Sequence, residues 1–184
     1  MNSNLVYGIG MQQRRKNTRL PGKEYLGTKS YFLTICCEKR VPLFADAERA
    51  RLVAGAIQNC AEKTGFRLHA YCVMPDHAHV LVEGIDGQTD GRIFARRFQQ
   101  KTGFLLRDTT AGRIWQRSYY DHILRKTEDC DDVAWYIWMN PVRKGMVQVA
   151  WNYEFSGSET VDWPPSNCAA RDGWIPPWKT GGVV

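Results

Sequence analysis

Two histidines, His77 and His79, stand two residues apart in the segment 75–79 (PDHAH), at the start of an apolar run. If this run is a strand, both side chains point to the same side with Cα atoms about 6.5 Å apart, so the two imidazoles can converge on one ion at about 2.1 Å each. Two ligands are too few for any metal, and the amide oxygen of Asn140 is the candidate third. A His-His-amide set with open positions suits Mg²⁺ or Mn²⁺.

Tyr136 precedes Asn140 by four residues, so on a helix the two side chains share a face about one turn apart. A phenol has an unperturbed pKa of about 10 and needs help to act as a nucleophile. A bound cation and basic surroundings are expected to favour the phenolate. A metal that polarises a phosphate oxygen beside an attacking tyrosine can carry out transesterification at a DNA phosphate. The sequence therefore predicts that Tyr136 cuts a DNA strand and stays linked to one end.

The periodicity of the chain predicts the elements that must bring these groups together. Alternating and β-branched residues predict strands over 31–38, 66–74, 77–83 and 119–125. Helical spacing predicts helices over 46–63, 90–102 and from 127 to about 140, with Gly65, Gly103 and Pro141 as end signals. This order predicts an α+β, ferredoxin-like βαββαβ fold: an antiparallel sheet with helices on one face, followed by a C-terminal catalytic helix and an extended tail.

Three segments also resemble a known family. The segment 75–80 (PDHAHV) resembles the histidine-hydrophobic-histidine (HUH) motif of single-tyrosine transposases. The segments 115–122 (WQRSYYDH) and 136–145 (YIWMNPVRKG) resemble the branch called REP-associated tyrosine transposases. By this resemblance, His77 and His79 are metal ligands, Asn140 is the third ligand, and Tyr136 forms a 5′-phosphotyrosine. The resemblance further implies Mg²⁺ or Mn²⁺ as cofactor and single-stranded DNA folded into palindromic hairpins as substrate.

Basic residues gather where they could follow a DNA backbone. Lys and Arg number 25 against 19 Asp and Glu, and the excess is concentrated in the first thirty residues and on the outer side of the predicted helix 90–102. His122 is left open between a hydrogen-bonded structural histidine and a group that supports the metal ligands. The predicted DNA-binding residues are Arg14, Arg15, Lys16, Arg92, Arg96, Arg97, Lys101, Arg117, Arg143 and Lys144.

A chain of 184 residues with 43% hydrophobic content predicts one packed domain with tails. We divide it into a basic arm (1–30), a catalytic domain (31–148) and a Trp/Pro-rich tail (149–184). The six cysteines lack C-x-x-C spacing and are interpreted as reduced core thiols of a cytoplasmic protein. No apolar run is long enough for a membrane span or a secretion signal, so no membrane partner is expected.

The sequence predicts a metal-dependent endonuclease and strand transferase that acts on hairpin-forming single-stranded DNA. Two alternatives stay open: a hairpin-binding module of the same fold without catalysis, and a metal-dependent hydrolase that uses bound water. A monomer is expected because no feature demands a dimer. A dimer in which a second subunit donates Tyr136 is the alternative.

Overall fold

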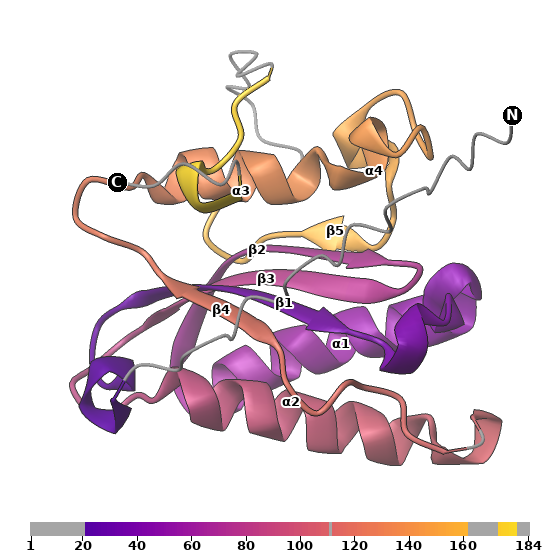
Figure 1. The fold of residues 1–184 in the computed structure, drawn as a ribbon, viewed down its shortest axis with the longest axis horizontal. Helices are drawn as coiled ribbons and strands as arrows, with labels where there is room; N and C mark the ends of the chain where they lie inside the picture. The colour runs from indigo at the N-terminus through magenta and orange to yellow at the C-terminus, as the bar shows by residue number, and fades with distance from the viewer. Residues whose placement is uncertain (1–20, 111, 162–172, 180–184) are drawn as a thin grey trace, which may run out of the picture.

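An antiparallel sheet of five strands in the order β4-β1-β3-β2-β5 forms the centre of the protein (Figure 1). The computed structural model describes residues 21–110, 112–161 and 173–179. The strands are β1 (Ser30–Cys36), β2 (Phe66–Met74), β3 (His77–Gly84), β4 (Tyr120–Ile123) and β5 (Ser156–Gly157). The first four strands and the two helices between them give the predicted ferredoxin-like order, which confirms the α+β fold class.

The helices cover both faces of this sheet. The helices α1 (Ala47–Thr64) and α2 (Gly91–Leu105) lie on one face, and α3 (Cys130–Trp138) and α4 (Asn140–Arg143) lie on the other (Figure 1). Each face has its own hydrophobic core: Phe94 and Phe98 of α2 are fully buried in the first, and Phe32 of β1 with Ile137 of α3 in the second. The sheet therefore separates the outer surface of α2 from everything that lies beside α3.

Local signals set the ends of α1 as predicted. The side chain of Asp46 accepts a hydrogen bond of 2.9 Å from the backbone N–H of Arg49, which caps the first turn. Gly65 follows the last turn with φ +74°, the left-handed conformation that glycine adopts without a steric cost. Both signals depend only on neighbouring residues, so they can be recognised in the sequence.

The predicted limits of the other two helices were wrong by a few residues. The helix α2 continues past Gly103 to Leu105, because the buried Leu106 beyond it keeps the last turn attached to the core. The helix α3 begins at Cys130 instead of Thr127, because the Asp129 side chain accepts from the N–H of Asp131 at 2.8 Å and caps the helix there. Ile93, expected to face inward, is 37% exposed.

The helical segment after α3 follows the expected interruption near Pro141. The helix α3 ends at Trp138, and after Met139 the short helix α4 begins with Pro141 in its first turn. A proline is tolerated at this position because its missing N–H would have no partner within the helix. The break leaves Tyr136 and Asn140 on consecutive segments that still follow one another closely.

A bulge at His69 reverses the alternation of side chains along β2. The register with β3 shifts between Leu68 and Ala70, so Leu68 faces the α1–α2 core whereas Ala70 and Cys72 face the α3 core. The strict alternation expected over residues 66–74 is therefore wrong at this point. As a result Cys72 is the cross-strand neighbour of His79.

Gly84 ends β3 where the backbone lies close to the segment before β1. A Cβ atom on Gly84 would collide with the Gly27 carbonyl oxygen and the Thr89 hydroxyl. We expect Gly84→Ala to lower the free energy of unfolding by about 2 kcal/mol. Gly55→Ala is the control, because Gly55 lies within α1 with open space around it, and the substitution should raise that free energy by up to about 1 kcal/mol. Urea unfolding measures both, and equal effects would contradict the steric explanation.

No helix within the described ranges is both long and apolar enough to cross a membrane. The five cysteines in these ranges carry free thiols, as the sequence predicts: Cys36, Cys37, Cys60, Cys72 and Cys130. Cys168 and the predicted DNA-binding residues Arg14, Arg15 and Lys16 lie outside the described residues.

Candidate active site

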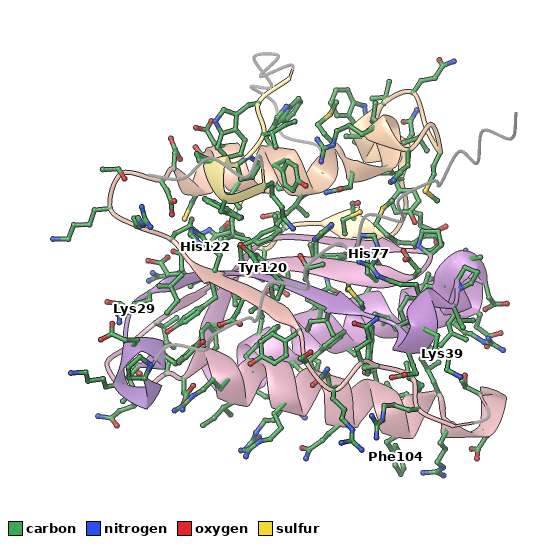
Figure 2. The ribbon with its side chains drawn as sticks, viewed as in Figure 1. Lys29, Lys39, His77, Phe104, Tyr120 and His122 are labelled. Carbon is green, nitrogen blue, oxygen red and sulfur yellow. The ribbon has the colours of Figure 1, made fainter. Side chains whose placement is uncertain are left out.

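His77 and His79 lie on β3, and Figure 2 shows His77 on this strand. The His79 ring lies against Phe32 and Tyr136 of the core between the sheet and α3. Their Nε2 atoms are 3.1 Å apart, and the ring centroids are 4.6 Å apart. His79 is buried, with 4% of its surface exposed, whereas His77 is closer to solvent. The pair thus has the shared orientation that its spacing on a strand predicts.

Asp76 and Thr34 contact the Nδ1 atoms of the two rings. The Nδ1 atom of His77 lies 2.5 Å from a carboxylate oxygen of Asp76, and Nδ1 of His79 lies 3.0 Å from the Thr34 hydroxyl. A carboxylate only accepts, so His77 must donate from Nδ1, and its Nε2 carries the lone pair. The Thr34 hydroxyl can donate or accept, and when it accepts, Nε2 of His79 is free as well. Both outer nitrogens can therefore point lone pairs at one ion.

Burial keeps both imidazoles in the form that binds metals. It lowers the pKa of His77, although the Asp76 carboxylate opposes the shift. Burial also holds the pKa of His79 well below its usual value, and the nearby positive charges of Lys179 and Arg143 add to this effect. Neutral imidazole, with one nitrogen unprotonated, is the ligand form for divalent cations.

The spacing of the pair suits an octahedral cation. Adjacent ligand atoms on an octahedral ion with bonds of about 2.1 Å are about 3.0 Å apart, close to the 3.1 Å between the two Nε2 atoms. Among the residues that the structure describes, no group of three or more His, Cys, Asp and Glu side chains could hold a metal. A third ligand from these residues would then be of another type, and the amide of Asn140 is the candidate that the sequence analysis names.

Asn140 is buried at the start of α4, directly after the helix that carries Tyr136. Its amide nitrogen donates to the backbone carbonyl oxygens of Tyr136 at 3.0 Å and Ile137 at 3.1 Å. These two bonds satisfy both amide hydrogens and fix the orientation of the side chain. The amide oxygen is the atom left for a cation.

The ring of Tyr136 lies beside the histidine pair of the same chain. Its centroid is 6.4 Å from that of His79 and 6.2 Å from that of Phe32, which stacks on His79 at 5.5 Å. The guanidinium carbon of Arg143 lies 4.3 Å from the Tyr136 centroid, and this residue also donates to the Tyr136 carbonyl oxygen at 2.5 Å. The helix α3 therefore brings its tyrosine to the strand that carries the histidines.

The side chains around Tyr136 do not by themselves favour the phenolate. Burial raises the pKa of the Tyr136 phenol above its usual value, and the Arg143 guanidinium opposes this shift without cancelling it. The ring of Tyr136 packs against Phe32 and the core under α3. A phenolate charge on this ring would lose part of its hydration. The protein side chains alone thus keep the phenol protonated.

His122 and Trp178 form an aromatic stack next to the site. The indole of Trp178 stacks on His122 at 3.7 Å between ring centroids and lies 6.1 Å from Phe32. His122 Nε2 lies 2.8 Å from a Glu128 carboxylate oxygen, and Figure 2 shows His122 on β4 beside Tyr120. Glu128 and Trp178 thus hold the His122 ring, and these contacts favour the structural alternative for this residue.

The predicted DNA-binding residues fall into two groups on opposite faces of the sheet. Arg92 is held by Asp90 at 2.6 Å and Lys101 donates to Asn59, so both have protein partners. The remaining members on the α2 side are exposed, as are those after α3 on the other face: Arg96, Arg97 and Arg117 on the first, Arg143 and Lys144 on the second. The predicted DNA-binding residues that the structure describes therefore do not all lie on the same face of the sheet.

Three supporting residues were not assigned a role from the sequence. Thr34 acts on His79 only through the β1–β3 register, which pairs the two residues across a separation of 45 positions. Asp76 stands next to His77 and could have been recognised, because a carboxylate beside a ligand histidine commonly fixes its tautomer. Lys179 reaches the site from the tail, with its Nζ 4.7 Å from the Tyr120 ring centroid.

Comparison with known proteins gives concordant results. The family model for IS200-like transposases matches residues 27–140, more than half of the chain. A REP-associated tyrosine transposase of Escherichia coli K12 is 24% identical over 147 residues, which cover 76% of this chain and 87% of that protein. An uncharacterized protein of Haemophilus influenzae is 25% identical over 167 residues, covering 74% and 92%. A solved structure of a REP-associated tyrosine transposase bound to a REP hairpin shares the fold, with a TM-score of 0.62, 24% identity and coverage of 72% and 78%.

Proposed function

Because the chain belongs to the family of IS200-like transposases, we propose that it nicks hairpin-forming single-stranded DNA and rejoins strands through a 5′-phosphotyrosine at Tyr136. One observation carries the proposal: the centroid of the Tyr136 ring lies 6.4 Å from that of His79 in the same chain, and Nε2 of His79 lies 3.1 Å from Nε2 of His77. The relatives named REP-associated tyrosine transposases, one of them solved with a REP hairpin, support hairpin DNA as the substrate.

The proposed reaction is a phosphoryl transfer without water as nucleophile. The Tyr136 oxygen attacks the phosphorus, and the bond from phosphorus to the 3′ oxygen of the preceding nucleotide breaks. The leaving oxygen takes a proton and becomes a 3′ hydroxyl, while the 5′ phosphate stays on the tyrosine. A 3′ hydroxyl can later attack that phosphotyrosine and restore a phosphodiester, because the bond energy is conserved.

His77, His79 and Asn140 would hold Mg²⁺ or Mn²⁺, which would neutralise charge on the phosphate oxygens as the tyrosine attacks. Arg143 is the protein side chain suited to assist the loss of the Tyr136 proton. Its guanidinium lies 4.3 Å from the ring and lowers the phenol pKa against the effect of burial. The aromatic contact with Phe32 restricts the ring and so the direction of attack.

The exposed arginines on the α2 side suggest where the paired stem of a hairpin binds. Two adjoining hollows there share Arg96, Gln99 and Arg117 in their walls. Arg117 lies three residues before β4, an edge strand whose Tyr120 is on the α3 side, next to Phe32. We therefore propose that the stem contacts α2 and Arg117, and that the single strand passes around the β4 edge to Tyr136.

The double substitution Arg96→Ala/Arg117→Ala is expected to weaken hairpin binding at every stem sequence. Removing two phosphate contacts should reduce the slope of log affinity against log salt by roughly 2. Arg51→Ala is the matched control, since Arg51 lies on α1 in an ion pair with Glu154. Fluorescence anisotropy at several salt concentrations measures the slope, and an unchanged slope in the double variant would remove α2 from the proposed path.

The proposed function is tested by incubating the protein and Mn²⁺ with a single-stranded hairpin labelled at its 3′ end, because the 5′-phosphotyrosine joins the protein to the 3′ fragment. A denaturing gel should show a protein-linked DNA band that disappears with chelator. Cleaved DNA without attached protein would indicate a hydrolase that uses water. Bound but uncut DNA, insensitive to chelator, would indicate a binding module without catalysis.

A further inference from the structure

The loop between β1 and α1 adopts an unusual backbone conformation beside the histidine pair. Lys39 and Arg40 are consecutive residues with φ of 53° and 57°, the left-handed region that favours glycine. Non-glycine residues keep this conformation only where the surrounding structure holds them, and such positions concentrate at functional sites. Figure 2 shows Lys39 in this loop at the same end of the sheet as His77.

Hydrogen bonds attach this loop to the turn between β2 and β3. The Cys37 N–H donates to the Asp76 carbonyl oxygen at 2.8 Å, and the Phe44 N–H donates to the Pro75 carbonyl oxygen at 2.9 Å. The turn that precedes His77 is thus held by backbone bonds on both sides of the strained residues. The loop and the turn form one unit.

A chain of side-chain contacts continues from this loop to the metal-binding candidate. Arg40 donates from Nη1 to one carboxylate oxygen of Asp76 at 3.0 Å, and the other carboxylate oxygen accepts from Nδ1 of His77 at 2.5 Å. Both oxygens of Asp76 are engaged, so its carboxylate cannot rotate without breaking one of these bonds. The orientation of the His77 ring follows from that of Asp76.

We propose that the Arg40–Asp76 pair is a positioning device that presents Nε2 of His77 to the cation, an inference that rests on the proposed metal site. Without the carboxylate, the neutral His77 ring can carry its proton on Nε2 and lose the lone pair needed for binding. Without the guanidinium, Asp76 can turn away from Nδ1. Neither residue touches the substrate or the ion in this proposal. The loss of such a supporting group typically weakens metal affinity by about 10–100-fold.

If the Arg40–Asp76 pair were merely structural, its substitution would leave Mn²⁺ affinity unchanged. The side chains of Arg40 and Asp76 are 52% and 29% exposed, and pairs this accessible contribute little to stability. Substitution should therefore leave folding intact while metal binding changes. Arg107 and Asp108 form a comparable exposed pair at 3.5 Å, remote from the histidines at the end of α2, which provides Asp108→Asn as matched control.

The test compares Asp76→Asn, Arg40→Ala, Arg40→Lys and Asp108→Asn in the full chain. Mn²⁺ affinity is measured by calorimetry and by paramagnetic broadening of histidine NMR signals. Asp76→Asn should raise the dissociation constant by about 10–100-fold and Arg40→Ala by about 10-fold, Arg40→Lys should restore part of the loss, and Asp108→Asn should have no effect. Imidazole ¹⁵N shifts of the metal-free protein should report Nδ1–H on His77 in the unsubstituted chain and loss of that preference in Asp76→Asn.

Two results would overturn the inference: unchanged Mn²⁺ affinity in Asp76→Asn, or the same His77 tautomer with and without the carboxylate. Failure of the proposed metal site looks different, because the unsubstituted protein would then bind no Mn²⁺ while the tautomer measurement still gives an answer. Failure of the nicking reaction alone would appear as a missing DNA adduct in a protein that still binds Mn²⁺. Adding Asp76→Asn to His77→Ala should cause no further loss of affinity. An additive loss would mean that Asp76 acts elsewhere than through His77.

Discussion

Tyr136→Phe protein is expected to bind hairpin DNA as tightly as the unsubstituted protein and to form no covalent adduct with it. The substitution removes one oxygen and keeps the ring, so the contacts with Phe32 and Arg143 persist. Loss of the nucleophile should lower the single-turnover cleavage rate by about 10³-fold or more. Denaturing gels of labelled hairpin with Mn²⁺ measure the rate, and anisotropy measures the affinity.

Tyr120→Phe is the matched control for this experiment. Tyr120 also lies half-buried on the α3 side, with its ring 6.3 Å from that of Phe32, and burial raises the pKa of its phenol as well. The adduct should form normally in this variant. If the adduct formed in Tyr136→Phe but not in Tyr120→Phe, Tyr120 of β4 would be the nucleophile.

The elements that the sequence predicts well are those controlled by neighbouring residues. Asp46 and Gly65 mark the two ends of α1 by local hydrogen bonding and local backbone conformation. The strand β5 could not be predicted, because its two residues form a strand only by pairing with Tyr71 and Cys72 of β2. The bulge at His69 is likewise a property of the β2–β3 pairing and has no marker in the alternation of β2 itself.

The candidate site likewise contains features that local geometry sets and features that depend on contacts between distant segments. The common orientation of His77 and His79 follows from strand geometry, so their spacing is enough to predict it. The meeting of Tyr136 with His79 depends on how α3 lies across the sheet, and the sequence predicts it only through the assumed role of Asn140 as third ligand and through the resemblance to a family. The support of His79 by Thr34 depends on the register of β1 against β3, which side-chain periodicity leaves undetermined.

The expected phenolate of Tyr136 depends on a bound cation and on basic surroundings, and the side chains next to the ring do not supply it by themselves. The ring packs against Phe32 and the core beneath α3, where desolvation outweighs the nearby Arg143. Sequence composition describes the average charge and gives no local dielectric environment. Trp178 of the predicted Trp/Pro-rich tail packs on the domain, against His122 and Phe32.

His79→Ala is expected to lower the rate of metal-dependent adduct formation by about 10²–10³-fold and to weaken Mn²⁺ binding. His77→Ala should have the same effect, and the double variant should be no worse than either single one, because the two imidazoles act on one ion as a unit. Hairpin affinity in the absence of metal should stay unchanged, since the arginines on α2 lie on the opposite face of the sheet.

His69→Ala is the control for these two substitutions. His69 is another strand histidine, but it is bonded to Glu83 at 3.0 Å and to Thr160 at 3.1 Å and lies on the bulge of β2. Its removal should leave Mn²⁺ affinity and adduct formation unchanged. If His77→Ala and His79→Ala behaved like His69→Ala, the ion would have to be held elsewhere. Tyr136 would then sit beside the two histidines without sharing a cation with them, and the proposed chemistry would lose its basis.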